Sequence, residues 1–334
     1  MGDKRGWMPP QMRAILACLA YSASSCTMVL LNKAVLSRFD YNYKACIMAL
    51  QGLVALSLML VSKRLGVLQF KALSKASLQL WFPVNIFFTL MLYTSFESLK
   101  RLHVPSVTIF KNVTNIIIAA GAWWWFGEKV NLYVGLSLGM VVLGALLAGA
   151  TDLSFDLEGY TWMAINCVST AAYVLYMRGT VKAPLSAWDK AFLNNAISVP
   201  LSLLLATGIG EIPDGITSPE LTAPAFIAAL ALSGCVGFAL NLTSLWCVSE
   251  TSATTYSMVG ALNKIPLAVL GTLLFGAPMD ARSGTMVAFG LAAGMVYAYA
   301  KTIDPDRPPT TPLSLIRVSP MLEAAKPKDS PTPI

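Results

Sequence analysis

Long runs of apolar residues are the feature that most constrains how this chain folds. Residues 15–31 and 132–150 contain no charged side chain, and residues 104–126 contain only Lys111. A helix needs about 20 apolar residues to cross the hydrocarbon core of a bilayer. Lys, Arg, Asp and Glu together form 12% of the chain, about half of the roughly 25% found in soluble domains. The sequence therefore predicts an all-α, polytopic integral membrane protein.

Ten membrane spans are predicted, joined by short connections. The spans cover residues 13–36, 45–62, 78–98, 104–124, 131–150, 159–178, 188–207, 223–246, 252–274 and 283–301. Residues 1–12 carry no short apolar run followed by a cleavage site, so the first span is expected to stay uncleaved. The proline-rich segment 303–334 predicts a disordered tail.

The distribution of Lys and Arg predicts the orientation of these spans. Most basic residues fall in the two terminal segments and in the connections on the same side as the termini. The other side receives Arg38, Lys44, Lys100, Arg101 and Arg282. Because basic loops stay cytosolic, both termini are expected in the cytosol. Lys33 lies near the edge of a span and is expected to extend to the membrane interface.

A weak internal repeat divides the spans into two groups. Phe126-Gly127 followed by Gly135 matches Phe275-Gly276 followed by Gly284, at an offset of 149 residues. The two units would be residues 13–150 and 151–302, with five spans each. An odd number of spans makes the repeats inverted, which is typical of alternating-access carriers. Two GxxxG pairs, Gly135/Gly139 and Gly290/Gly294, predict close helix packing and leave a homodimer open.

Two lysines lie within apolar spans, Lys111 and Lys264. A cation at the centre of a bilayer costs about 3 kcal/mol even on the mildest scale. No clear span interior contains Asp or Glu, so neither lysine has an evident acidic partner. Snorkelling to the interface is the alternative, but two unpaired cations favour an anionic ligand, above all phosphate.

Polar residues near these lysines extend the candidate site. Tyr256, Gly260 and Lys264 follow each other at four-residue intervals, so they share one helical face, with Asn263 beside it. Gly260 could also serve helix packing alone. Pro266 cannot donate a hydrogen bond to the carbonyl of Leu262, which loosens the helix there.

A pair of amides, Asn194 and Asn195, lies in another apolar span. Paired donors and acceptors suit the edge of a nucleobase. Hydrogen bonding between helices is an equally good interpretation of these two residues.

The segment from Thr254 to Lys264, which ends in Gly-Ala-Leu-Asn-Lys, resembles a known family. Together with Phe110-Lys111-Asn112 and Ala20-Tyr21, it is similar to the Golgi GDP-mannose transporters of the nucleotide-sugar transporter family, within the drug/metabolite transporter superfamily. The resemblance covers nearly all of residues 13–302. It implies a GDP-mannose:GMP antiporter of the Golgi membrane that supplies glycosylation and needs no cofactor or metal.

The same resemblance implies roles for individual residues. Guanine recognition would fall to Asn194, Asn195 and Asn241. Sugar and diphosphate would be held by Tyr256, Gly260, Ala261, Asn263 and Lys264, and Tyr21 and Lys111 would complete the pocket. The chain departs from the family at Leu193, where a tyrosine is expected, so the sugar specificity stays open.

Other functions fit the sequence less well. Another GDP-sugar such as GDP-fucose is the nearest alternative. A sugar-phosphate or phosphate translocator would have no clear use for adjacent amides, and a proton-driven exporter would need a membrane-embedded carboxylate. A glycosyltransferase would need acidic groups, and the main acidic cluster, Asp152, Asp156 and Glu158, reads as a solvated loop. Nucleic-acid binding is not expected, because no basic patch carries interleaved aromatic residues.

Overall fold

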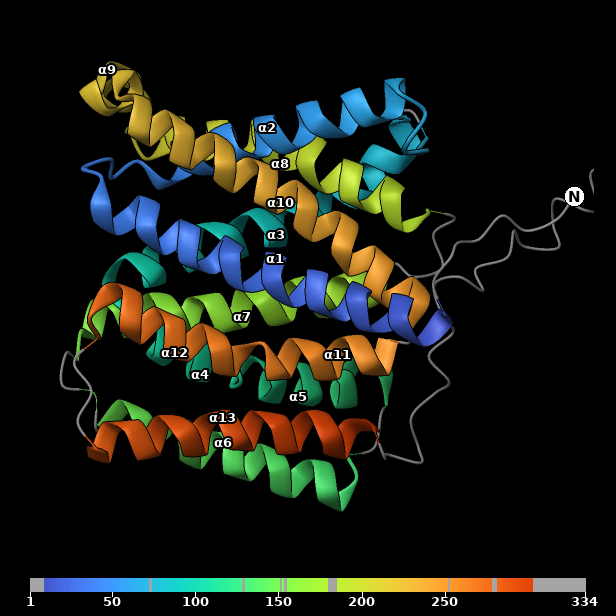
Figure 1. The fold of residues 1–334 in the computed structure, drawn as a ribbon, viewed down its shortest axis with the longest axis vertical. Coiled ribbons are helices and arrows are strands. Elements are labelled where there is room, and N and C mark those ends of the chain that lie inside the picture. The colour runs from blue at the N-terminus through green and yellow to red at the C-terminus, as the bar shows by residue number, and fades with distance from the viewer. Residues whose placement is uncertain are drawn as a thin grey trace, which may run out of the picture.

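The computed structural model describes residues 9–71, 74–127, 130–150, 152, 155–179, 185–251, 253–277 and 281–302, and all regular structure in these ranges is helical. The terminal segment 1–8 and the predicted tail 303–334 lie outside the described residues. The helices run nearly parallel or antiparallel to one another in a single bundle (Figure 1). This arrangement confirms the prediction of an all-α protein.

Each predicted span corresponds to helical structure. The elements are α1 (Pro10–Arg38), α2 (Lys44–Arg64), α3 (Lys75–Arg101), α4 (Val104–Phe110), α5 (Thr114–Phe126), α6 (Leu132–Ala150), α7 (Leu157–Gly179), α8 (Ala187–Gly208), α9 (Glu211–Thr217), a 3₁₀ turn at Pro219–Thr222, α10 (Pro224–Glu250), α11 (Ala253–Leu262), α12 (Lys264–Phe275) and α13 (Ala281–Thr302). The short α9 and the 3₁₀ turn join α8 to α10 and pack against the end of the bundle where α2 begins.

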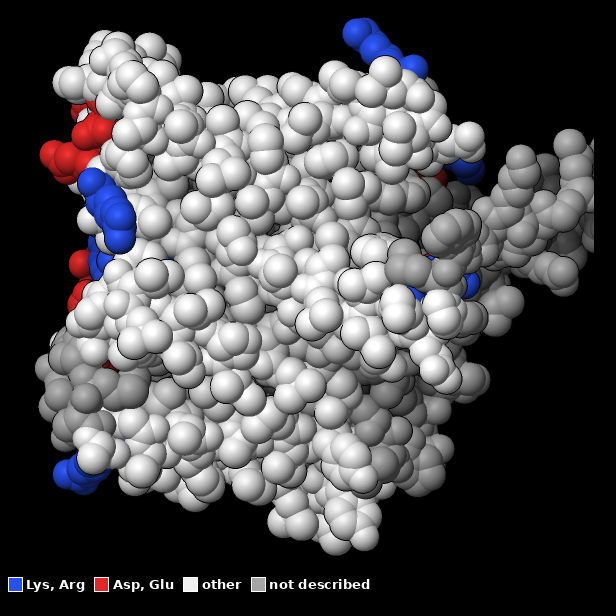
Figure 2. Space-filling view, in the orientation of Figure 1, with Lys and Arg blue, Asp and Glu red and all other residues white. Residues whose placement is uncertain are grey.

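The surface of the bundle is suited to a membrane. Nine helical stretches among the described residues are long and apolar enough to cross a bilayer, with α4–α5 and α11–α12 each counted as one stretch. The remaining long helix, α7, is more polar and packs against α3 and α5. Charged side chains gather at the two ends of the molecule, and a broad uncharged belt separates them (Figure 2). The protein is therefore a multi-pass membrane protein.

Two predicted spans are interrupted where the sequence predicted continuous helices. The segment at residues 104–124 divides into α4 and α5, with a turn at residues 111–113, and the segment at 252–274 divides at Asn263 into α11 and α12. Both segments end in the same way, because Gly127 and Gly276 adopt positive φ angles of 65° and 60° and terminate α5 and α12. Only glycine adopts this conformation at little cost.

The side chain of Lys33 extends to the end of a span, as predicted, but it is buried there. Its Nζ donates hydrogen bonds to the carbonyls of Leu99 at 2.7 Å and Leu102 at 2.8 Å, both just beyond the predicted span 78–98. These carbonyls belong to the last turn of α3 and the residue after it, where unpaired carbonyl groups carry the negative end of the helix dipole. Lys33 therefore ties α1 to the end of α3.

Candidate functional site

Both interrupted helices break at the residues that the sequence singled out. Lys111 caps the end of α4, and the following turn makes hydrogen bonds three residues apart, from Asn112 N to Ile109 O and from Val113 N to Phe110 O, both at 2.9 Å. A short 3₁₀ stretch inside a helix often marks a functional position. Lys264 begins α12, two residues before Pro266, whose missing N–H leaves the carbonyl of Leu262 without its helical donor. The expected loosening at Pro266 is thus confirmed. The break at Lys111 has no such proline after it, so the sequence did not predict it.

A hydrogen bond joins the two breaks. Nζ of Lys264 donates to Oδ1 of Asn112, and Nδ2 of Asn112 donates to the carbonyl of Gly290 at 3.2 Å. Gly294 makes room for this amide, since a Cβ there would lie only 2.5–2.8 Å from three side-chain atoms of Asn112. The glycine pair on α13 therefore serves packing inside the chain and fixes the partner of Lys264.

The second lysine has a weaker partner. Nζ of Lys111 donates to the hydroxyl of Ser95 on α3 at 3.4 Å. Lys264 contacts Asn112, the residue that follows Lys111, so the two cations belong to one region of the bundle. Among the described residues, no carboxylate forms an ion pair with either lysine. Two cations held by neutral side chains in an apolar bundle form a site that favours an anion.

Tyrosines from two helices lie beside the α11–α12 break. The rings of Tyr21 on α1 and Tyr256 on α11 have centroids 4.5 Å apart. Gly260 faces Tyr21, since a Cβ there would lie 3.4 Å from the hydroxyl of that tyrosine, an ordinary contact distance. Next to them Asn263 is buried, and its side-chain Nδ2 has no hydrogen-bond partner among the described residues. A buried donor without a partner costs about 1–3 kcal/mol, and a ligand oxygen would satisfy it.

The predicted base-reading amides separate into two environments. Asn194 lies between α3 and α7, where Oδ1 accepts from Nε1 of Trp81 at 2.7 Å and Nδ2 donates to the hydroxyl of Tyr173 at 3.3 Å. Asn195 points toward α2, with Nδ2 3.8 Å from Sδ of Met59 and 2.9 Å from the carbonyl of Ala191. The interpretation of Asn194 as an interhelical hydrogen-bonding residue is therefore confirmed, and base reading stays a prediction.

Asn241 makes a local hydrogen bond on α10. Its Nδ2 donates to the carbonyl of Gly237 on the same helix at 3.0 Å. No hydrogen bond of the described residues joins it to Asn194 or Asn195.

Three groups of predicted site residues thus lie in the bundle. Tyr21, Tyr256 and Gly260 form one, and Lys264 with Lys111 forms the second, near Cys167 on α7. Asn194 forms the third with its hydrogen-bond partners Trp81 and Tyr173. The sequence did not single out Trp81, Tyr173 or Ser95, because their roles depend on contacts between distant helices.

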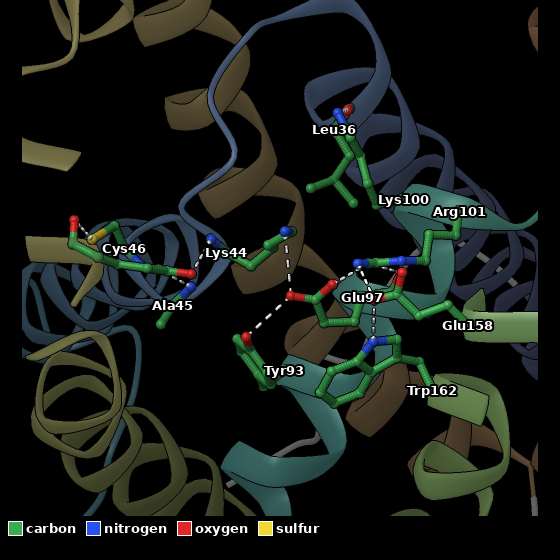
Figure 3. Close-up of polar contacts among 11 residues, drawn as sticks. Leu36, Lys44, Ala45, Cys46, Tyr93, Glu97, Lys100, Arg101, Glu158 and Trp162 are labelled. Carbon is green, nitrogen blue, oxygen red and sulfur yellow. Dashed lines mark hydrogen bonds and ion pairs between the residues drawn. The ribbon is translucent and has the colours of Figure 1, made fainter. Parts of the chain in front are cut away.

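A polar cluster that the sequence did not predict lies at the end of the bundle where α2 and α7 begin and α3 ends, and Figure 3 shows its contacts. Glu97 on α3 is buried, and it forms ion pairs with Lys44, at 3.3 Å, and with Arg101. Arg101 also contacts Glu158 on α7 at 2.5 Å. The cluster therefore connects α2, α3 and α7 at this end, and it shows that one carboxylate near a span end is buried with compensating charges.

Together, the bundle and its two cationic breaks define the class of the protein: an all-helical, multi-pass membrane transporter with paired discontinuous helices. The chain belongs to the Triose-phosphate Transporter family, whose sequence model matches residues 12–299. Membership of a transporter family agrees with the prediction that the chain is not an enzyme.

Individual relatives cover most of the chain. It is 39% identical to the GDP-mannose transporter GONST1 of Arabidopsis thaliana, over 90% of this chain and 92% of the relative. It is 40% identical to a GDP-mannose transporter of Komagataella pastoris, over 86% of this chain and 91% of that protein. A solved crystal structure with 15% identity aligns with a TM-score of 0.50 over 84% of this chain and 98% of its own, which supports the fold alone.

Proposed function

We propose that this protein carries GDP-mannose across the Golgi membrane into the lumen in exchange for GMP. The observation that carries the proposal is the pair of ammonium groups at the breaks of two discontinuous helices, without a carboxylate to neutralise them in the described part of the chain. A diphosphate would supply the missing negative charge. Relatives that cover most of the chain are named GDP-mannose transporters, which supports this choice of anion.

The packing of the helices supports an inverted repeat of five spans in each half. The proposed equivalence relates α1 to α7, α2 to α8, α3 to α10, α4–α5 to α11–α12, and α6 to α13. The pair α1 with α10 then corresponds to α7 with α3, and the pair α2 with α10 corresponds to α8 with α3; all four pairs are in contact. The packing of α2 on α8 and of α6 on α13 is symmetric by itself, and the contact of α5 with α7 corresponds to that of α12 with α1. The units would be residues 13–150 and 151–302, giving ten spans.

The proposed transport cycle rests on the bond between Lys264 and Asn112. Within the described residues, Lys264 bonds to Asn112 and Lys111 to Ser95, both through neutral side chains. Substrate phosphate would displace these neutral partners, and this difference in binding would drive the two halves to rock about the site. The exchange needs no ion gradient, since each nucleotide compensates the charge in turn.

The sides of the membrane follow from charge and from the ends of the chain. Helix α1 begins and α13 ends at the same end of the bundle (Figure 1). Most of the Lys and Arg residues lie at this end or belong to the terminal segments of the sequence. We therefore place both termini in the cytosol. The cluster around Glu97 would then lie on the lumenal side.

Specific roles are proposed for the predicted site residues. Asn194 and Asn195 would read guanine with Asn241, while Tyr256, Gly260, Ala261, Asn263 and Lys264 would hold the sugar and the diphosphate, and Tyr21 and Lys111 would close the pocket from the other half. Leu193 is buried against Trp81, Val84, Leu185 and Ile197. The aromatic residue expected at this position is therefore replaced by an aliphatic one within the α3–α8 packing, so GDP-fucose is a second candidate substrate.

Exchange in proteoliposomes tests the proposal. Vesicles preloaded with GMP would receive labelled GDP-mannose, with GDP-fucose, a UDP-sugar and triose phosphate as competitors. We expect saturable uptake that needs internal GMP and that is lost in Lys264→Ala and in Asn195→Ala. Competition by GDP-fucose would show a relaxed sugar site. Uptake of triose phosphate without response to any guanine nucleotide would refute the proposal and favour a sugar-phosphate translocator.

A homodimer is proposed through α6. The second glycine pair, Gly135 and Gly139, differs from that on α13, because a Cβ at Gly139 would meet no atom within 4 Å and one at Gly135 would meet only Val130, at 3.9 Å. These glycines are thus free for close approach of a second copy. Cross-linking of a cysteine placed at position 139 in native membranes would test it, and the absence of a dimer band would contradict it.

A further inference from the structure

Asn194 is held at both ends of its amide by hydrogen bonds to other helices. Nε1 of Trp81 on α3 donates to Oδ1 at 2.7 Å, and Nδ2 donates to the hydroxyl of Tyr173 on α7 at 3.3 Å. Trp81 is fully buried, with 0% of its surface exposed, and packs against Leu193, the residue before Asn194. The ammonium of Lys190 lies 5.6 Å from the centre of its ring. The indole is therefore fixed from several directions.

The indole determines which way the amide faces. An indole N–H is only a donor, so it must meet the oxygen of the amide and never its NH₂ group. A tyrosine hydroxyl can donate or accept, so Tyr173 would tolerate either orientation. A reversed amide would bring two donors together at the position where the 2.7 Å bond now lies. Trp81 therefore fixes the amide, and Tyr173 adapts to it.

The fixed orientation of the amide matters because an amide that is free to rotate could pair with either purine base. An asparagine amide has two lone pairs and two hydrogens; after the bonds to Trp81 and Tyr173, one acceptor position and one donor position remain. Guanine presents an acceptor, O6, beside a donor, N1–H, whereas adenine presents a donor, N6, beside an acceptor, N1. An amide that rotates by 180° can satisfy both patterns, and an amide held in one orientation satisfies one of them.

We infer that Trp81 is a specificity-determining positioning residue, which holds the amide of Asn194 in the orientation that accepts guanine and excludes adenine. The inference rests on the proposed function, because it takes Asn194 as a residue that reads the base. Trp81 acts through Asn194 and does not itself need to touch the nucleotide. Leu193, where the chain departs from the family, packs against Trp81. It therefore supports the indole that orients Asn194.

Base selectivity in nucleotide binding tests the inference separately from transport. The purified full-length protein in detergent would be titrated with GMP and with AMP, and the concentration that gives half-maximal thermal stabilisation would be measured for each. We expect wild-type protein to prefer GMP. Trp81→Phe removes the donor and keeps an aromatic ring, so the preference should fall by roughly tenfold, the factor for one ordinary hydrogen bond. Tyr173→Phe should keep most of the preference, because Trp81 still fixes the amide.

A matched control exists on α7. Trp162 also donates its indole N–H to a side-chain oxygen, that of Glu158 at 3.4 Å, in the polar cluster remote from Asn194. Trp162→Phe therefore deletes the same group elsewhere and should leave the GMP preference unchanged. If Trp81→Phe does not fold, 3-benzothienylalanine at position 81 keeps the shape of the indole without its N–H.

The outcomes separate the two proposals. A wild-type protein that binds GMP and AMP equally would overturn the proposed base reading, and the role of Trp81 with it. A wild-type preference that persists in Trp81→Phe, or in the benzothienylalanine variant, would refute the role of Trp81 alone. An equal loss in Trp162→Phe would attribute the effect to general destabilisation and would also refute it.

Discussion

Replacing Gly294 with alanine should disturb the site from a position that need not touch the substrate. The new Cβ would lie 2.5 Å from Nδ2 and 2.8 Å from Oδ1 of Asn112, whereas ordinary contacts lie at 3.4–4 Å. Asn112 is 2% exposed, so it cannot move away freely. The amide must shift by about an ångström, which weakens its bond to Lys264 and its bond to the carbonyl of Gly290.

The size of the effect follows from three contributions. Overpacking costs about 1–3 kcal/mol, and loss of a hydrogen bond to a charged group costs about 1.5–3 kcal/mol. Alanine by itself stabilises the fold by about 0.5–1 kcal/mol, because it restricts the unfolded chain more than glycine does. The net expectation is a destabilisation of about 2–5 kcal/mol, seen as a lower unfolding temperature in detergent and a higher apparent KM for GDP-mannose exchange.

The control for this prediction is Gly208→Ala, at the last residue of α8. A Cβ at Gly208 would meet no atom within 4 Å, so the same substitution is made without a clash. Its unfolding temperature and exchange should match or slightly exceed those of the wild type. Wild-type stability and KM in Gly294→Ala would refute the view that this glycine positions Asn112. An equal loss in both variants would attribute the effect to the change from glycine to alanine itself.

Three further predictions concern the remainder of the bundle. Glu97→Gln should destabilise the protein by about 3 kcal/mol, because Glu97 is buried and the change removes the ion-pair partner of Lys44 and one of the two partners of Arg101, both partly buried. Glu158→Gln should cost less than about 1 kcal/mol, since the side chain of Glu158 is 64% exposed, against 5% for Glu97. Thermal unfolding of both variants would check this difference, and equal losses would contradict it. Burial, with the nearby charge of Lys33, lowers the pKa of His103, the single histidine of the chain. The unfolded chain then binds the proton more readily than the folded protein, so His103 makes stability fall as pH drops below about 6.5. His103→Gln should remove that part of the pH dependence of thermal unfolding. An unchanged dependence would show that other groups cause the fall in stability. Asp189→Ala should lose about 1–2 kcal/mol in thermal unfolding, because this carboxylate completes the capping box of α8 and accepts from the backbone N–H of Lys71 at 2.7 Å; wild-type stability would contradict this.

The sequence alone determined the membrane-spanning, all-helical character and the residues at which chemistry is concentrated. Apolar length is a local property, and a bilayer imposes it on each segment separately. The loosened helix at Pro266 was visible for the same reason, since a missing N–H acts on a residue four positions away. Lys111 and Lys264 stood out because a charge in an apolar segment is costly wherever the segment packs.

Only the tertiary structure decided the partners of these residues. Lys264 bonds to Asn112, 152 positions away in the sequence, and Trp81 bonds to Asn194, 113 positions away. Lys33 bonds to two carbonyls at the end of α3, 66 and 69 positions away. No local pattern specifies such pairs, since each depends on how two helices pack and on a glycine or a carbonyl made available there. The break at Lys111 also depends on tertiary structure. No proline follows it in the sequence to predict it, and a contact from another helix holds Asn112 in place. The physical reason is that helix formation is satisfied within one segment, whereas a buried polar group must be satisfied by whichever segment packs against it.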